Sequence, residues 1–260
     1  MKNRILNFIL AFVSLALVLL LNSCSGCSRS GRARIAKKQE VKQNSRHINA
    51  NSSEKKDKRK EETKPSYPKE TTSMSKKSVA ALFKDLEKGV FMVFALDDDG
   101  SGSQGSGFFI NSVGIGVTNY HVLQGHNDYS IKTSNGEFYE IIDILESSEP
   151  DELDFVIFKV NNRGEHFKKQ RIATDRTAIG EDVFAIGSPK GLENSLTKGS
   201  VSGYRDNYRI QIDATIDHGS SGGPLFNMDG EVIGITTSGV EGSALNFAVD
   251  IQAIPYKKYK

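Results

Sequence analysis

Apolar and polar positions divide the chain into three parts. Residues 1–21 begin with two basic side chains and continue as an almost unbroken apolar run from Ile5, which is the order of an export signal. Residues 24–78 contain almost no large apolar side chains, so this segment cannot bury enough surface to fold. From Val79 onward, short apolar runs recur. The pattern therefore predicts a signal at 1–23, a disordered linker at 24–78 and a folded domain at 79–260.

The folded domain is predicted to be all-β after one short helix. Apolar residues recur at helical spacing over 78–88, with Ser78 as the expected cap. The rest reads as short β-prone runs separated by glycine-bearing turns about every 8 to 12 residues. This number of strands, with an interruption at 161–177, favours two six-stranded antiparallel β-barrels with a cleft between them. The predicted strands are 90–96, 105–110, 115–119, 129–133, 138–143, 155–160, 182–186, 196–204, 208–213, 223–226, 232–238 and 246–249.

Charge changes sign at the same boundary. Residues 24–78 contain 16 Lys and Arg against 6 Asp and Glu, whereas residues 79–260 contain 16 basic and 26 acidic residues. A basic stretch can bind nucleic acid, but an exported one more often meets anionic lipid, polysaccharide or solvent. We therefore expect no nucleic-acid partner and interpret the basic segment as a solvated stalk.

The only two cysteines, Cys24 and Cys27, directly follow the apolar run. The segment Leu-Asn-Ser-Cys at 21–24 resembles a bacterial lipobox, in which the signal is removed and the cysteine is lipidated, although Asn22 departs from that pattern. An uncleaved anchor helix and a cleaved signal that releases the protein are the alternatives. The sequence thus predicts lipidation at Cys24, a membrane-anchored protein in the bacterial envelope that faces the periplasm or exterior, and a folded domain without disulfides.

A serine flanked by glycines is the sharpest chemical signal. The segment Gly-Ser-Ser-Gly-Gly-Pro at 219–224 directly follows a predicted strand. Glycines permit backbone angles that would let the amides of Gly219 and Ser221 point into one concavity, as an oxyanion requires. An ordinary Gly-Ser turn has the same composition. The segment also matches the nucleophile elbow of α/β-hydrolases, but there the histidine follows the serine, and all five histidines here precede Ser221.

The order His, Asp, Ser is that of chymotrypsin-like enzymes. His121 is predicted to close a strand beside the cleft, whereas His126 lies in a polar loop and is expected to face solvent. Asp154 begins an apolar strand, and a buried carboxylate needs a hydrogen-bond donor such as an imidazole. Asp151 and Glu152 are alternatives in a more polar context. A packed core histidine and a capping aspartate are the structural alternatives for the pair.

Eight segments of the folded domain carry a family resemblance. They are, in chain order, G-S-G-F-F-I, T-N-Y-H-V, L-D-F-V-I-F-K-V, A-I-G-S-P-K-G-L, G-S-V-S-G, D-A-T-I-D-H-G-S-S-G-G-P-L, G-E-V-I-G-I and N-F-A-V. Over about 79–254 the chain resembles the Deg/Htr proteases, which have the chymotrypsin fold. The resemblance implies that His121 is the base, Asp154 its orienter and Ser221 the nucleophile, with an oxyanion hole formed by Gly219, Ser220 and Ser221.

The resemblance also carries expectations about partners and two departures. It implies protein or peptide substrates, no metal or organic cofactor, and a homotrimer formed through the N-terminal segments. Ser220 stands where the family usually has asparagine or aspartate, and Tyr120 stands where a small or polar residue is common. Family members commonly carry a C-terminal PDZ module, and no such module follows the protease segments here, so we expect regulation of another kind.

The substrate pocket is predicted to be small and mostly apolar. Thr215 stands six residues before Ser221, where trypsin-like enzymes place the acid that binds Lys or Arg, so basic side chains should not be selected. Ile235, Thr236 and Leu245 are expected to complete the slot. The sequence therefore predicts a serine endopeptidase that cuts unfolded or exported proteins, and the alternative is a catalytically silent protease fold that acts as a binding or scaffolding protein.

Overall fold

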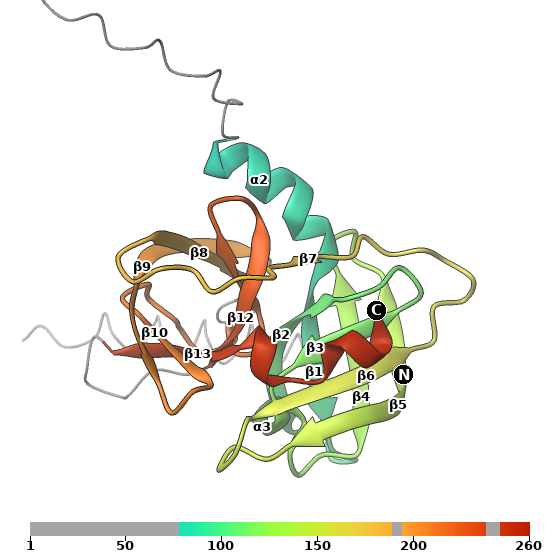
Figure 1. The fold of residues 1–260 in the computed structure, drawn as a ribbon. Coiled ribbons are helices and arrows are strands. Elements are labelled where there is room, and N and C mark those ends of the chain that lie inside the picture. The colour runs from blue at the N-terminus through green and yellow to red at the C-terminus, as the bar shows by residue number, and fades with distance from the viewer. Residues whose placement is uncertain (1–77, 189–193, 238–244) are drawn as a thin grey trace, which may run out of the picture. The chain divides into compact units, whose positions relative to one another are not determined.

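Two antiparallel β-barrels follow one short helix in the computed structural model, which describes residues 78–188, 194–237 and 245–260 (Figure 1). All of these residues belong to one compact unit of the chain. The predicted signal, the linker and Cys24 lie outside the described residues. Within the part that the structure describes, no helix has both the length and the apolar character needed to cross a membrane.

The helix α2 (Val79–Leu86) confirms the helical pattern of the sequence. The Ser78 hydroxyl accepts a hydrogen bond from the Ala81 amide at 3.2 Å and caps the first turn. Leu82 and Leu86 are the buried side chains of the helix, and they lie beside Gly230, where an added Cβ would approach them to 3.1 and 3.4 Å. A 3₁₀ turn, η1 (Glu87–Gly89), then leads into the first barrel.

The first barrel is closed and antiparallel throughout. Its strand order is β1-β2-β3-β6-β5-β4. β5 extends well beyond the predicted strand and shifts register twice against β6, and such shifts interrupt the alternation that a pattern search detects. The strands are β1 (Val90–Leu96), β2 (Gly102–Phe109), β3 (Ile115–Thr118), β4 (Asp128–Thr133), β5 (Phe138–Ser148) and β6 (Phe155–Val160).

An aromatic cluster fills the first barrel. The Phe91 ring centroid lies 4.5 Å from that of Phe109 and 6.0 Å from that of Phe158. Gly107 on the neighbouring strand makes room for this ring, because an added Cβ would come within 2.3 Å of Phe91. Tyr139 is 1 % exposed, and its burial raises the pKa of the phenol to about 12, so the hydroxyl donates steadily to the Glu165 carboxylate.

The second barrel is built from strands in the order β11-β8-β9-β10-β13-β12, and pairing between β11 and β12 closes it. A further short strand, β7, pairs in parallel with β12. It lies inside the stretch that the sequence predicts to be an interruption. The two barrels confirm the predicted fold class. The strands are β7 (Arg171–Ile172), β8 (Asp182–Gly187), β9 (Ser195–Arg205), β10 (Arg209–Ile212), β11 (Pro224–Asn227), β12 (Glu231–Thr237) and β13 (Asn246–Asp250).

The C-terminal segment runs back from the second barrel to the first (Figure 1). It consists of η3 (Ile251–Ala253) and η4 (Tyr256–Tyr259). The side-chain amide of Asn111 donates to the Tyr259 carbonyl at 2.9 Å, and the Tyr259 hydroxyl donates to the Glu146 carboxylate at the same distance. One continuous apolar cluster contains Phe108 and Ile157 of the first barrel together with Ile186 and Phe226 of the second. The two barrels therefore share an apolar cluster along the seam between them.

Candidate active site

His121 and Asp154 form a close pair beside this seam. The imidazole Nδ1 lies 2.8 Å from Asp154 Oδ2, and the His121 amide donates to Oδ1 of the same carboxylate at 3.1 Å. The His121 side chain is 32 % exposed, whereas that of Asp154 is 12 % exposed. The imidazole therefore reaches solvent on one side while its carboxylate partner stays covered. Asp151 and Glu152, the alternatives from the sequence, are both exposed.

Asp154 is held in its position by several independent contacts. Its φ of 49° lies in the left-handed region, which is costly for most residues and tolerated best by Asn and Asp after glycine. The Asn119 side-chain amide donates to the Asp154 carbonyl at 2.7 Å, and the Asp154 amide donates to the Glu149 carbonyl at 3.0 Å. The Thr237 hydroxyl on β12 lies 3.4 Å from Oδ2. Groups from both barrels thus orient the carboxylate.

His121 lies on a short helix, α3 (Tyr120–Leu123), and not at the end of a strand as predicted. The chain turns into this helix directly after β3, because Val122 and Leu123 bury their side chains in the first barrel. The Ser103 hydroxyl donates to the Val122 carbonyl and holds the other end of the turn. The helix places the imidazole at the seam, which a continued strand would not do.

The turn that carries Ser221 lies directly against α3 and β3. A Cβ added to Gly105 would come within 2.7 Å of both Val122 methyls and 2.9 Å of the Ser221 carbonyl. A Cβ added to Gly222 would come within 3.1 Å of the Asn119 amide. These two glycines let the segments that carry His121 and Ser221 approach each other. No hydrogen bond joins Ser221 Oγ to His121 in the described residues, and contacts of this kind often tighten only when substrate binds.

A tight turn at 217–220 shapes the backbone directly before Ser221. The Ser220 amide donates to the Asp217 carbonyl at 3.0 Å, and Gly219 has a φ of 93°, as in the third position of a type II turn. Because its amide is used in this turn, Ser220 does not offer the donor that the sequence assigned to it. The amides of Gly219 and Ser221 donate to no acceptor within the described ranges. They are the two donors available for a developing oxyanion.

Replacing Gly219 by alanine should lower kcat by about 10²- to 10³-fold, as expected for loss of one oxyanion donor. Alanine disfavours the positive φ, so the turn would change toward type I, which reverses the peptide that bears the Gly219 amide. Initial rates on a peptide ester measure the effect. Gly180→Ala is the matched control, because Gly180 has a φ of 89° in open space. Equal kcat values for the two variants would contradict this role of Gly219.

Two of the four residues predicted to line the substrate pocket are covered. Ile235 is 0 % exposed and packs in the apolar seam cluster. Thr236 is 1 % exposed, and its hydroxyl donates to the Ser220 carbonyl at 2.7 Å. On β12, one side chain therefore faces the core and the next faces the turn that carries Ser221, so neither lines an open slot, contrary to the prediction. Thr215 and Leu245 are exposed and remain predicted pocket residues.

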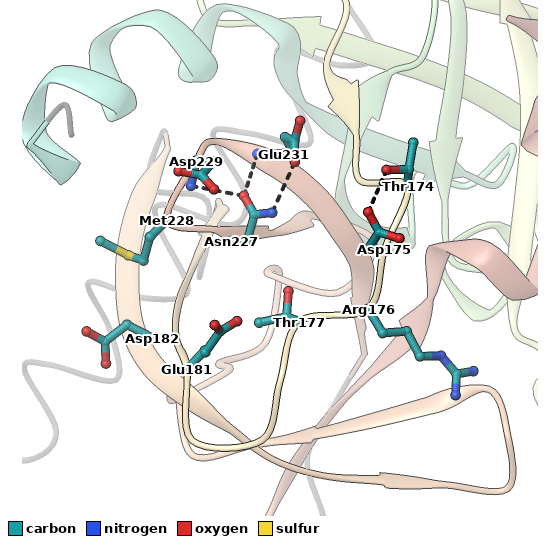
Figure 2. A pocket seen from close by; sticks show the side chains of 10 residues that line it. All are labelled: Thr174, Asp175, Arg176, Thr177, Glu181, Asp182, Asn227, Met228, Asp229 and Glu231. Atoms are coloured by element: carbon teal, nitrogen blue, oxygen red, sulfur yellow. Dashed lines mark hydrogen bonds between the residues drawn. The ribbon is translucent and has the colours of Figure 1, made fainter. Parts of the chain in front are cut away.

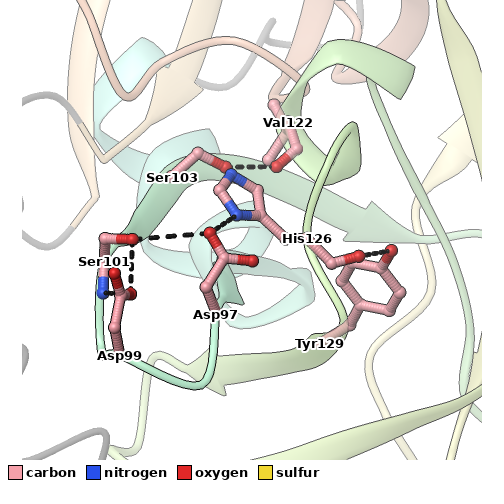
Figure 3. A network of polar contacts seen from close by, with 7 residues as sticks. All are labelled: Asp97, Asp99, Ser101, Ser103, Val122, His126 and Tyr129. Atoms are coloured by element: carbon pink, nitrogen blue, oxygen red, sulfur yellow. Dashed lines mark hydrogen bonds and ion pairs between the residues drawn. The ribbon is translucent and has the colours of Figure 1, made fainter.

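His126 takes part in a separate polar network and does not face solvent as predicted (Figure 3). Its Nδ1 lies 3.0 Å from Asp97 Oδ2, its side chain is 17 % exposed, and Ser101 approaches the same carboxylate. The Tyr129 hydroxyl donates to the His126 carbonyl. Because β1 pairs with β4, the ends of these strands meet here. This second His-Asp pair lies at the end of β1 and the beginning of β4.

An acidic pocket of about 380 Å³ lies apart from these residues (Figure 2). It is lined by the segment after β7, the start of β8 and the turn between β11 and β12, and none of the candidate catalytic residues is among its lining side chains. Within the described ranges, no group of three or more His, Cys, Asp or Glu side chains is arranged to hold a metal ion.

Sequence reasoning missed three polar residues that support the candidate site. Asn119 and Thr237 bind the Asp154 carbonyl and carboxylate respectively, and Ser106 binds the Gly219 carbonyl at 2.7 Å. The signal was weak, because Ser106 lies between two glycines in a strand with other polar residues, and Asn119 directly follows a strand that ends in Thr118. A buried polar side chain must find a hydrogen-bond partner.

Comparisons with known proteins give one family. The family described as "Trypsin-like peptidase domain" matches residues 105–235. "Serine protease HTRA1" of Xenopus laevis is 36 % identical over 160 residues, which cover 56 % of this chain and 34 % of the relative. "Probable periplasmic serine endoprotease DegP-like" of Bartonella henselae is 35 % identical over 159 residues, which cover 58 % of this chain and 31 % of the relative.

A solved structure is similar over a larger share of the chain. The serine endoprotease from Yersinia pestis superposes with a TM-score of 0.61 at 27 % identity, over 68 % of this chain and 64 % of that chain. The chain spans about a third of the length of the curated relatives that it matches.

Proposed function

The chain belongs to the trypsin-like peptidase domain family, and from this premise we propose that it is a serine endopeptidase that hydrolyses peptide bonds with Ser221, His121 and Asp154. The observation that carries the proposal is the 2.8 Å contact between His121 Nδ1 and Asp154 Oδ2, beside a turn in which Gly219 and Ser221 keep unused amides. A buried acid, a partly exposed imidazole and two backbone donors are the parts that acyl transfer requires.

In the proposed mechanism, His121, Asp154 and Ser221 each have a separate role. Asp154 accepts a hydrogen bond from Nδ1–H of His121, which keeps the proton on Nδ1 and leaves the lone pair on Nε2. His121 then takes the hydroxyl proton of Ser221 as Oγ bonds to the peptide carbonyl carbon, and the oxyanion is bound by the amides of Gly219 and Ser221. The imidazolium returns the proton to the leaving amine, which departs and leaves an acyl-enzyme. Water activated by the same imidazole then hydrolyses the ester and restores the Ser221 hydroxyl.

We place the substrates among unfolded or exported proteins of the bacterial envelope. The apolar run at 1–21 supports export, and relatives from Bartonella henselae and Rhizobium meliloti are named periplasmic endoproteases. The proposal includes a signal at 1–23, a basic linker at 24–78 and a protease domain at 79–260. It also includes membrane anchoring, through a lipid on Cys24 or an uncleaved apolar helix, and assembly into a homotrimer.

A fluorophosphonate probe tests the proposed function directly. The purified full chain should be labelled, and mass spectrometry of its fragments should locate the label on Ser221, because only an activated serine reacts rapidly with this probe. The same preparation should cleave denatured casein, and labelling beforehand should abolish cleavage. A chain that binds casein without cleaving it or taking up the label would be a silent binding protein, and the proposal would fail.

A further inference from the structure

A buried serine of the first barrel contacts the turn that carries the nucleophile. Ser106 lies on β2 and is 0 % exposed. Its hydroxyl donates to the Gly219 carbonyl at 2.7 Å and accepts from the Ser188 amide at 2.9 Å. Both bonds cross the seam, since Gly219 and Ser188 belong to the second barrel. One hydroxyl therefore joins two loops of that barrel to a strand of the other.

The backbone of Ser106 reinforces the same contact. Its amide donates to the Ser221 carbonyl at 2.8 Å, and its carbonyl accepts from the Thr118 hydroxyl at 2.7 Å. On the far side of the turn, the Thr236 hydroxyl donates to the Ser220 carbonyl at 2.7 Å. Three successive carbonyls, those of residues 219, 220 and 221, are thus each bound from outside the turn.

A bound carbonyl fixes the direction in which the amide of the next residue points, because the two groups share one peptide plane. In a trans peptide the N–H is directed opposite to the C=O of the same plane. Thr236 therefore orients the Ser221 amide through the Ser220 carbonyl. The Gly219 carbonyl shares its plane with the Ser220 amide, so that plane is held on one side by the Ser106 hydroxyl and on the other by the bond from the Ser220 amide to the Asp217 carbonyl. Because glycine has more backbone freedom than any other residue type, the turn that orients the Gly219 amide is held less firmly when the Ser106 bond is removed.

We propose that Ser106 is a positioning residue of the oxyanion hole: its hydroxyl fixes the peptide plane between Gly219 and Ser220, which keeps the turn at 217–220 in the form that presents the Gly219 amide beside the Ser221 amide. The inference rests on the proposed peptidase function. Ser106 does not touch substrate and acts only through the turn. Its effect should fall on the transition state, where the oxyanion exists, and not on binding of the ground state.

Steady-state kinetics on a peptide ester test the proposal. Ser106→Ala should lower kcat by about 10- to 100-fold, less than outright loss of a donor, with KM within about twofold of the parent. Ser106→Thr keeps the hydroxyl and should recover most of kcat. Ser130→Ala is the matched control, because Ser130 is 3 % exposed on β4 of the same barrel, and it should match the parent. Unchanged kcat in Ser106→Ala would overturn the proposal.

Inhibitor affinities separate positioning from a general structural role. A peptide aldehyde forms a hemiacetal with the nucleophile, whose oxygen occupies the oxyanion hole, so its affinity should fall by the same factor as kcat/KM. A non-covalent product peptide should bind Ser106→Ala as tightly as the parent. Equal losses for both ligands would indicate a distorted cleft and contradict the inference.

The design also separates this inference from the proposed function. If the parent chain neither takes up fluorophosphonate nor cleaves the ester, the peptidase proposal fails, whatever Ser106 does. If the parent is active and Ser106→Ala is equally active, only the positioning role fails. Should Ser106→Ala not fold, Ser106→Cys fills the site with a side chain whose S–H is only a weak donor. It must then show the selective loss of aldehyde affinity.

Discussion

Ser221→Ala should lower kcat for peptide hydrolysis by about a millionfold, because the members of a catalytic triad act as a unit. The side-chain oxygen of Ser221 makes no hydrogen bond to any described residue, so its removal leaves no buried partner unsatisfied. The backbone bond from the Ser106 amide to the Ser221 carbonyl remains. The variant should therefore fold like the parent while losing turnover. Casein cleavage followed by gel and by released amines measures the loss.

The control variant removes a serine hydroxyl at another buried position. Ser130→Ala also removes one buried hydroxyl from the unit, but β4 pairs only with β1 and β5 of the first barrel. It should retain the kcat of the parent. Comparable casein cleavage by Ser221→Ala, in a preparation free of contaminating protease, would show that another group attacks the peptide bond.

Asp154→Asn should lower kcat by about 10⁴-fold while the fold is preserved. Each oxygen of the carboxylate accepts from His121, one from the amide and one from Nδ1. A side-chain amide has only one such oxygen, so one of its N–H groups must face His121. The tautomer with its proton on Nε2 is then favoured, and this tautomer cannot accept the proton of Ser221.

The backbone conformation at position 154 should survive the substitution. Asparagine tolerates the left-handed region as well as aspartate does, so the φ of 49° can be kept. The bonds from Asn119 to the Asp154 carbonyl and from the Asp154 amide to Glu149 do not involve the side chain. Unfolding midpoints should therefore stay close to the parent, and ¹⁵N spectra of the imidazole should report the changed tautomer.

A second His-Asp pair supplies the control for this substitution. Asp97 contacts His126 Nδ1 at 3.0 Å, so Asp97→Asn makes the same chemical change in the same kind of pair. It should leave kcat close to the parent value, because this pair lies at the ends of β1 and β4 and is separate from the contact between His121 and Asp154. If Asp154→Asn retained kcat within about tenfold of the parent, Asp154 would not be the residue that orients the base.

Much of the fold was predictable because burial imposes local periodicity. β1 and β6 match the predicted strands residue for residue, since both are nearly continuous apolar runs bounded by turn residues. β7 was missed because two residues cannot display an alternation. The end of β5 was missed because its register shifts twice against β6. His121 was assigned to a strand end because a single turn of helix has no periodicity to detect.

By itself, the sequence determined which residues the proposed chemistry could use: the order of His121, Asp154 and Ser221, the all-β class and the glycines in the turn that carries Ser221. Only the tertiary structure decided which polar groups support that chemistry and which side chains are covered. The Ser106 hydroxyl meets a carbonyl 113 residues away, and Ile235 is covered by the packing of both barrels. Such contacts depend on how separate strands close and meet at the seam, and no local pattern encodes a partner so distant in the chain.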